Sequence, residues 1–532
     1  MSHKNSMRPL SPAAVKAMLA DGGELAPIDV REELIYSRHH LLWARNVPLS
    51  RLELRFARLV PRRTTRIVLY DDNDGLVERA ADILTSAGYS DLSYLDGGIA
   101  AWEQAGFVLF SGMHVPSKAF GEFVEHTGGT PSIGAGELDA LLREGCDLKV
   151  LDSRPFDEYA RASIPTATNV PGAELVLRVR DIVPSPATTI VVNCAGRTRS
   201  IIGAQSLIDA GVPNKVLALR NGTMGWQLAG LACDSGKSVR APEVSRAGLS
   251  WAKTQAEAVA RKFGVEHIDR ATLARWQTDD TRTIYIFDVR DPAEYEAGHL
   301  PGALPAPGGQ LVQATDAYAG TLQARIVLSD DKEVRALMTA SWLKRMGWRD
   351  VFVLPQAGQE SDKETGQPAD HVLGKPPPDA AAPFSAAMEI DDVTVIDLSR
   401  SPNYRRGHIP GAWFAIRSRL ARAFANIPLH SEIVLTSEDG VLAGLAVAEA
   451  RALTTRPVHW LKGGNAAWAA AGFPLATGMK MADEPVDVWL KPYEQSGDSE
   501  AAMTAYLAWE VDLLERIKRD GTCQFMAKSR YT

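Results

Sequence analysis

A chain of 532 residues is too long for one hydrophobic core, and its length predicts about three or four domains. Hydrophobic residues make up 45% and charged residues 23%, as in soluble globular proteins. The net charge of −7 does not indicate binding to nucleic acid or to a membrane surface. The start lacks the apolar core of a signal peptide, and no apolar run approaches a bilayer span. Four scattered cysteines exclude a disulfide framework and a C-x-x-C metal site. We therefore expect a cytoplasmic protein in reducing surroundings, without metal or cofactor.

Two strand patterns recur in each of four units along the chain. The first strand is apolar and ends in Asp. A second apolar strand follows at the same distance in the first three units and at a slightly shorter distance in the fourth. The first strands end at Asp29, Asp152, Asp288 and Asp397, and the second strands end at Asp71, Cys194, Asp330 and Ser437. A helix-like run follows each second strand, so the pattern predicts a repeated α/β unit with parallel strands.

This repeat predicts an α/β fold of four tandem three-layer domains with central parallel sheets, followed by a C-terminal helical tail. The expected domains cover residues 8–112, 131–236, 264–370 and 384–478, and the expected tail covers 483–532.

The segments between and after the domains also have readable patterns. Residues 113–130 hold Pro, Ser and Gly, 250–262 predict a connecting helix, and the Pro-rich run 375–383 predicts a stiff extended linker. An apolar stripe in the tail predicts a helix docked on the body. The stripe consists of Met503, Tyr506, Leu507, Val511 and Leu514.

The end of the second strand in unit two carries the strongest chemical signal. Cys194 is followed by a short loop with Arg197 and Arg199, and a helix is predicted over 201–207. Backbone N–H groups at a helix start have no intrahelical partner, so they and the two guanidinium groups favour a thiolate. The alternative is an ordinary buried cysteine. Because the other three units have Asp or Ser at this position, the scaffold does not need a cysteine for packing, and we interpret Cys194 as a nucleophile.

Several elements together resemble the rhodanese (sulfurtransferase) family. They are the strand-Asp-x-Arg start, the run Glu294–Ala303 with its His-Leu-Pro-Gly-Ala end, its counterpart Asn403–Ala412, the cysteine loop and a closing Gly-Gly…Trp element. The resemblance covers nearly the whole chain up to about residue 478 as four copies. It implies one catalytic domain, the second. The first, third and fourth would be inactive because they carry Asp71, Asp330 and Ser437 at the cysteine position.

The resemblance also implies a mechanism and partners. Cys194 would take a sulfane sulfur as a persulfide and pass it to a thiophilic acceptor. The substrate-binding loop would consist of Ala195, Gly196, Arg197, Thr198 and Arg199. The implied partners are a small anionic sulfur donor such as thiosulfate and a thiol or cyanide acceptor, with an acceptor protein as a further option. No nucleic acid and no membrane is expected.

Other residues near this loop are weaker candidates. Asp152 and Arg154 form a structural pair or support the loop, and Arg220 with Asn221 would lie at the rim of the site because they follow a strand end. Cys233 is either a packed free thiol or a resolving thiol.

Two other functions compete with sulfur transfer. Phosphatases and arsenate reductases that resemble this fold use Cys-x5-Arg, whereas Arg199 gives Cys-x4-Arg, a loop one residue short for a tetrahedral oxyanion. A scaffold or regulatory binding protein is the other alternative, because three of the four units lack the cysteine.

Overall fold

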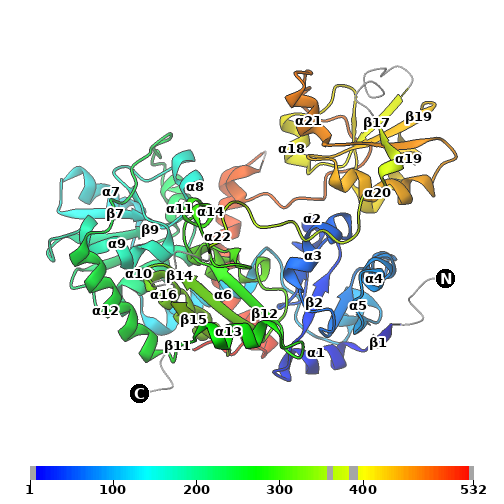
Figure 1. Cartoon of the computed structure of the whole chain (residues 1–532). Helices are drawn as coiled ribbons and strands as arrows, with labels where there is room; N and C mark the ends of the chain where they lie inside the picture. The colour runs from blue at the N-terminus through cyan, green and yellow to red at the C-terminus, as the bar shows by residue number, and fades with distance from the viewer. Residues whose placement is uncertain (1–6, 356–362, 383–392, 496, 527–532) are drawn as a thin grey trace.

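The computed structural model describes residues 7–355, 363–382, 393–495 and 497–526. These residues form four α/β domains, each around a five-stranded sheet, with one strand order repeated four times (Figure 1). The order is β1-β5-β4-β2-β3 in domain 1 and its equivalent in the others, and every ladder within the sheets is parallel. The predicted fold class is therefore confirmed. No helix within the described ranges is long and apolar enough to cross a membrane.

Domains 1 and 2 each contain five strands and five helices in the same sequence. Domain 1 consists of β1 (Arg8–Leu10), α1 (Pro12–Ala20), β2 (Ala26–Asp29), α2 (Glu33–Tyr36), β3 (Arg45–Asn46), α3 (Leu52–Leu59), β4 (Ile67–Tyr70), α4 (Leu76–Ser86), β5 (Leu92–Leu95) and α5 (Gly98–Gln104). Domain 2 consists of β6 (Ser132–Ile133), α7 (Ala135–Arg143), β7 (Leu148–Asp152), α8 (Phe156–Arg161), β8 (Thr168–Asn169), α9 (Leu175–Ile182), β9 (Thr189–Asn193), α10 (Thr198–Asp209), β10 (Val216–Leu219) and α11 (Gly222–Leu228).

Domains 3 and 4 follow the same plan. Domain 3 consists of β11 (Glu266–His267), α13 (Arg270–Gln277), β12 (Ile284–Asp288), α14 (Pro292–Ala297), β13 (Leu304–Pro305), α15 (Gly308–Gln313), β14 (Arg325–Asp330), α16 (Val334–Arg345) and β15 (Val351–Pro355). Domain 4 consists of β16 (Ala381–Ala382), β17 (Val393–Asp397), α18 (Ser401–Arg406), β18 (Trp413–Phe414), α19 (Leu420–Asn426), β19 (Glu432–Thr436), α20 (Val441–Arg451), β20 (Val458–Leu461) and α21 (Gly464–Ala470).

The segments outside the sheets contain more regular structure than the sequence indicated. Residues 113–130 contain a complete helix, α6 (Val115–Gly128), which begins with Pro116 in its first turn. The predicted connecting helix is present and starts earlier, as α12 (Arg246–Lys262). Part of the predicted extended linker 375–383 forms the edge strand β16, so the fourth sheet begins before residue 384.

The tail forms a short 3-10 turn, η7 (Pro492–Glu494), and the long helix α22 (Ser499–Asp520). Its buried side lies slightly off the predicted stripe: Met503 and Leu507 are buried, but Val511 is 51% exposed, so its place in the stripe was wrong. Leu513 and Ile517 take over the packing and bury against α6. Charged Glu510 also lies on the buried side, and this broke the apolar pattern in the sequence.

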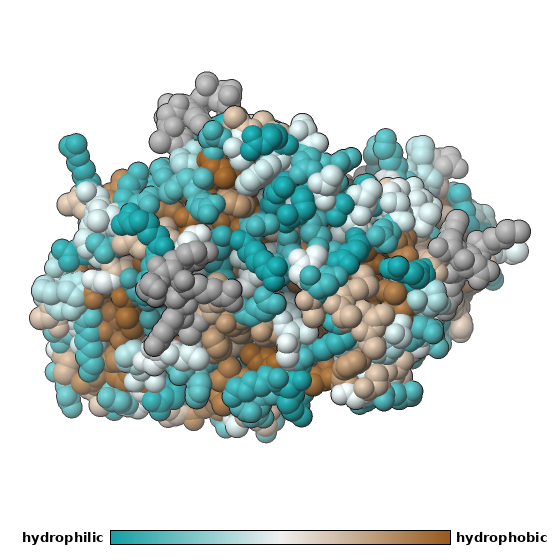
Figure 2. Space-filling model, turned by 90° about the horizontal axis from the view of Figure 1, so that it is seen from below, coloured by the Kyte–Doolittle hydropathy of each residue, from teal (hydrophilic) through white to brown (hydrophobic). Residues whose placement is uncertain are grey.

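Domain 3 contacts both domain 2 and domain 1, and domain 1 also contacts domain 4; Thr283 of domain 3, for example, donates its N–H to Glu24 of domain 1 at 2.9 Å. Domains 2 and 3 share one hydrophobic core, in which α10, α9 and α12 pack with α16. Domain 4 contacts domain 1 through ion pairs such as Arg417–Glu53 at 2.7 Å, and Figure 1 shows it above domain 1 and away from domain 2. Hydrophilic residues dominate the face seen from below, with hydrophobic residues in separate patches (Figure 2).

Candidate functional site

Cys194 lies directly after β9 at the carboxyl end of the domain 2 sheet, and its side chain is 2% exposed. Its Sγ lies 3.6 Å from Oγ of Ser200, whose hydroxyl donates to the carbonyl of Arg197 at 2.8 Å. The Cys194 carbonyl accepts the N–H of Thr223 at 2.8 Å. Gly222 has φ +54°, and a Cβ there would lie 2.2 Å from the Cys194 carbonyl oxygen, so glycine is required for this close approach.

The same loop in the sister domains binds an anionic side chain through its backbone. In domain 1 the two carboxylate oxygens of Asp71 accept N–H groups of Asn73 at 2.8 Å and Val77 at 3.0 Å. In domain 3 the carboxylate of Asp330 accepts N–H groups of Lys332 at 3.2 Å and Arg335 at 2.8 Å. The loop and first helical turn therefore form a cradle for negative charge, and domain 2 places a sulfur atom in that position.

The Arg197 guanidinium pairs with two carboxylates of α6. Its Nε and one terminal nitrogen donate to Glu122 at 2.7 Å each, and that nitrogen also donates to Glu125. The other terminal nitrogen donates to Oδ1 of Asn221 at 3.2 Å. Nearly all the hydrogen-bonding capacity of this guanidinium is therefore spent on holding the loop against α6.

Arg199 is held in the same way by a different carboxylate. Its terminal nitrogens donate to both oxygens of Glu158 at 3.2 and 2.8 Å, and one of them also donates to Gln310 of domain 3 at 3.2 Å. Burial acts to raise the pKa of Glu158, but Arg199 and Lys491 outweigh it and hold that pKa well below its ordinary value. The pair is thus fully ionised at neutral pH.

The weaker candidate residues near the loop differ in burial and in the contacts that they make. Asp152 and Arg154 pair at 2.6 Å, and the same pair recurs in domains 1 and 3, so its role is to brace the strand end. Arg220 is exposed and donates to Ser132, whereas Asn221 contacts Arg197 at the loop. Cys233 packs with the domain 2 core, and burial raises its thiol pKa.

Cys194 opens into a cavity of about 240 Å³ whose wall comes from five parts of the chain. Domain 1, α6, the domain 2 loop, domain 3 and the tail all contribute. The wall residues that the sequence patterns did not single out are Glu33, Met113, His114, Lys118, Met224, Gln313, Trp489, Lys491, Pro492, Tyr493 and Glu494. Tyr506 also lines it, although the pattern marked it only as part of the docking stripe. The proline at the start of α6 was the available signal for that helix.

Helix α6 approaches the catalytic loop closely because of Gly121. A Cβ at this position would lie 2.9 Å from a methyl carbon of Thr198, the first residue of α10. This contact brings Lys118 to the cavity, where its Nζ lies 3.1 Å from the buried carboxylate of Glu510 on α22.

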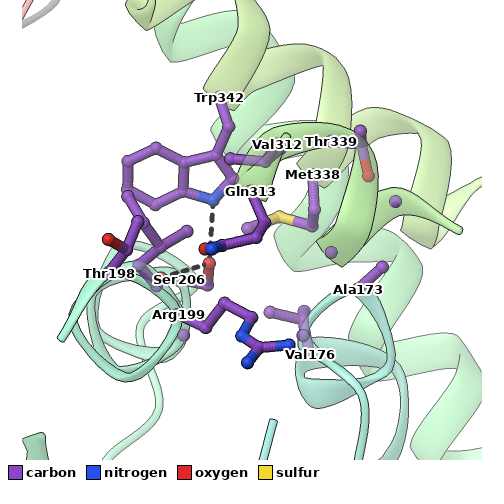
Figure 3. Close-up of a pocket in the computed structure, with 15 residues that line it drawn as sticks. Ala173, Val176, Thr198, Arg199, Ser206, Val312, Gln313, Met338, Thr339 and Trp342 are labelled. Atoms are coloured by element: carbon purple, nitrogen blue, oxygen red, sulfur yellow. Dashed lines mark hydrogen bonds between the residues drawn. The ribbon is translucent and has the colours of Figure 1, made fainter. Parts of the chain in front are cut away.

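A second cavity, of about 30 Å³, lies on the far side of α10 between domains 2 and 3 (Figure 3). Figure 3 shows α10 facing α16 across this space, with the indole Nε1 of Trp342 donating to Oγ of Ser206 at 2.8 Å. The walls are mostly apolar, and Cys194 does not line it. The space is large enough for little more than a water molecule, so it is a packing gap rather than a reaction site.

Glu257, His267 and Glu333 have the side-chain types of a metal site and lie close together. The His267 Nε2 lies 3.7 and 3.6 Å from oxygens of Glu257 and Glu333, and all three side chains are at least partly exposed. None of the three lines the Cys194 cavity.

Comparison with known proteins gives a consistent result. The rhodanese-like domain family matches the chain four times, over residues 11–105, 134–229, 269–357 and 380–471. The crystal structure of thiosulfate sulfurtransferase from Pseudomonas aeruginosa is similar, with a TM-score of 0.96 and 46% identity over 98% of this chain and 100% of that one.

Curated relatives match over shorter stretches. A probable 3-mercaptopyruvate sulfurtransferase of Pseudomonas aeruginosa is 35% identical over 119 residues, 21% of this chain and 40% of that protein. An HTH-type transcriptional regulator of Mycobacterium tuberculosis is 33% identical over 112 residues, 21% of this chain and 49% of that protein. The chain spans about half the length, or less, of these relatives.

Proposed function

Because the chain belongs to the family of rhodanese-like domains, we propose that it is a sulfurtransferase that carries sulfane sulfur on Cys194 as a persulfide. The donor is a small anion such as thiosulfate, and the acceptor is a thiol or cyanide. The similarity to thiosulfate sulfurtransferase of Pseudomonas aeruginosa supports this choice of donor.

The reaction needs no cofactor, because a thiolate attacks sulfur directly. The Cys194 thiolate attacks the outer sulfur of thiosulfate, a new S–S bond forms, and sulfite leaves with the electron pair of the broken S–S bond. The acceptor thiolate or cyanide then attacks the outer sulfur of the persulfide. The new bond to the acceptor forms as the persulfide S–S bond breaks, and the Cys194 thiolate returns.

The observation that carries the proposal is the cradle of backbone N–H groups at the loop. In domains 1 and 3 these groups bind the carboxylates of Asp71 and Asp330. In domain 2 they are available to the thiolate and to the charge on the outer persulfide sulfur. Because Arg197 and Arg199 are tied to carboxylates, we assign them to shaping the loop rather than to binding the donor directly.

The sister domains favour an enzyme over a scaffold. Gln310 of domain 3 contacts Arg199, and Glu33 of domain 1 lines the cavity. Domains 1 and 3, two of the three domains that lack the cysteine, thus contribute to one site. A phosphatase is disfavoured because the Arg199 guanidinium is turned toward Glu158.

Intact mass spectrometry tests the proposal. After incubation with thiosulfate and removal of excess donor, the protein is expected to gain about 32 Da, the mass of one sulfur atom. The Cys194→Ser variant should gain nothing, and cyanide should remove the adduct from the wild type. A wild-type protein that gains no sulfur from thiosulfate, or a serine variant that does, would contradict the proposal.

A further inference from the structure

The positive charges around the Cys194 cavity are not equally available to a substrate. Arg197 and Arg199 line the cavity, but each guanidinium is engaged by carboxylate and amide oxygens. Lys491 also lines it, with a side chain that is 39% exposed and paired with Glu158 at 3.3 Å. Solvent screens such a half-exposed charge.

Lys118 is as buried as the two arginines, but a single carboxylate oxygen faces its charge, whereas each guanidinium contacts both oxygens of a carboxylate. Its side chain is 11% exposed, and its Nζ lies 3.1 Å from Glu510 and 5.7 Å from the ring centre of Tyr506. Burial acts to lower the pKa of Lys118, but Glu510 and the Tyr506 hydroxyl raise it above its ordinary value, so the ammonium stays charged. An ammonium has three donors, and two partners leave one for the cavity.

Glu510 fixes this ammonium to the catalytic loop. Its carboxylate is 0% exposed, and Oε1 faces Lys118 at 3.1 Å and accepts hydrogen bonds from the hydroxyl groups of Tyr506 at 3.2 Å and Thr198 at 3.5 Å. Oε2 has no hydrogen-bond partner among the described residues and would lie 3.1 Å from a Cβ placed on Gly196. A buried carboxylate with an unpartnered oxygen lowers stability, so its place against the loop calls for a functional reason.

We propose that Lys118 binds the oxyanion end of the sulfur donor and determines specificity for it, with Glu510 as the positioning residue. The proposal rests on the sulfurtransferase function above and names its donor class: compounds with a sulfonyl oxyanion beside the transferable sulfur, of which thiosulfate is the simplest. Lys118 holds an oxygen of the donor while the Cys194 thiolate takes the outer sulfur. The S–S bond of the donor breaks, and its electron pair leaves with the sulfite or sulfinate.

This assignment places the specificity residue outside the catalytic domain. Lys118 comes from the interdomain helix α6, and Glu510 comes from the tail helix α22. Trp489 and Tyr493, also from the tail, supply an aromatic wall to the same cavity. Donor recognition therefore depends on segments that an isolated rhodanese-like domain does not contain.

Steady-state kinetics with thiosulfate and cyanide test the role of Lys118. The Lys118→Met variant keeps the side-chain length without the charge, and we expect its KM for thiosulfate to rise about tenfold or more with kcat changed less than about threefold, because one charge-assisted hydrogen bond is lost. Lys118→Arg should stay within about threefold of the wild-type KM. The control is Lys253→Met, an exposed lysine on α12 that does not line the cavity, whose KM should change less than about twofold.

A second readout separates donor binding from damage to the site. Persulfide is loaded with saturating thiosulfate, and its discharge by the uncharged thiol 2-mercaptoethanol is followed by the loss of 32 Da. Lys118→Met should discharge at about the wild-type rate, because an uncharged acceptor does not need the ammonium. A discharge rate that falls as far as kcat/KM for thiosulfate would overturn the assignment.

The outcomes distinguish this inference from the proposed function. Wild-type protein that gains no 32 Da defeats the proposed function itself. Normal loading together with an unchanged KM in Lys118→Met defeats only the role of Lys118. Where the single variant unfolds because Glu510 is left alone, the double variant K118M/E510Q removes both charges, and a wild-type KM in that protein overturns the proposal equally.

Discussion

At the scale of single residues, one loop position takes three kinds of side chain in this molecule. The carboxylates of Asp71 and Asp330 accept two or more backbone N–H groups each, and Ser437 accepts one at 3.3 Å. Cys194 occupies the same place beside Ser200. Because the backbone cradle is shared, the residue at this position decides the chemistry and not the fold.

The Cys194→Asp variant tests this separation. The new carboxylate should accept the same loop N–H groups as in domains 1 and 3, so the free energy of unfolding should stay within about 1 kcal/mol of wild type. Thiosulfate should add no sulfur to it. Urea denaturation and intact mass measure the two effects, with Cys194→Ser as the control, and a loss of more than about 3 kcal/mol would contradict a shared cradle.

At the scale of elements, the repeat in the sequence predicted the four sheets well because each unit repeats the same strand ends. The loop of Cys194 was also identified, because three sister loops served as internal comparison. The partners of Arg197 could not be predicted. Glu122 and Glu125 lie on α6, and the sequence of this helix resembled that of an interdomain linker. Contacts between segments far apart in the chain leave no periodic pattern.

The tail helix α22 also shows that contacts between distant segments cannot be predicted from the local sequence pattern. An apolar stripe was recognised, but Glu510 faces the interior and Val511 faces solvent, so hydropathy alone assigned the wrong residue to the buried side. Glu510 is buried because it pairs with Lys118, a residue more than one domain away in the sequence.

Leu513 tests whether helix α22 must dock for the site to work. Its side chain is fully buried against α6 beside Val115 and Ala119, so Leu513→Ala should weaken docking by about 2–5 kcal/mol. Loosening α22 withdraws Glu510 from Lys118, and the KM for thiosulfate should rise as proteolysis within 499–520 accelerates. Val511→Ala on the exposed side of the same helix is the matched control. Equal protease sensitivity and KM in the two variants would argue against docking as a requirement.

At the scale of the whole molecule, the domains without cysteine hold the tail over the active domain. Glu33 of domain 1 accepts the N–H of Trp489 at 3.2 Å and pairs with Arg400 of domain 4 at 2.7 Å. Lys491 and Glu494, a few residues further along, pair with Glu158 and Arg161 of domain 2. The cavity wall is therefore connected to the contact between domains 1 and 4.

That contact contains a carboxyl group that makes stability depend on pH. Glu32 accepts hydrogen bonds from Ser50 of domain 1 at 2.9 Å and Ser418 of domain 4 at 2.6 Å. Burial raises its pKa from 4.5 to about 7, although the two hydroxyl groups act in the opposite direction. Between these two values the folded protein keeps a proton that the unfolded chain has lost. The contribution of Glu32 to stability therefore falls as pH rises from about 4.5 to 7 and stays constant above that window.

The Glu32→Gln variant removes this titration while keeping an oxygen for one serine. Between pH 5 and pH 8 we expect the wild type to lose about 2–3 kcal/mol more unfolding free energy than the variant, since each unit of pKa shift corresponds to about 1.4 kcal/mol. Urea denaturation at several pH values measures the difference, and Glu24→Gln, a change at another interdomain carboxylate, is the control. If the plots of unfolding free energy against pH are parallel for wild type and Glu32→Gln, the Glu32 carboxyl group is ionised in the folded protein over this whole pH range, which contradicts the prediction. The pH response would then have to come from other groups at the domain boundaries.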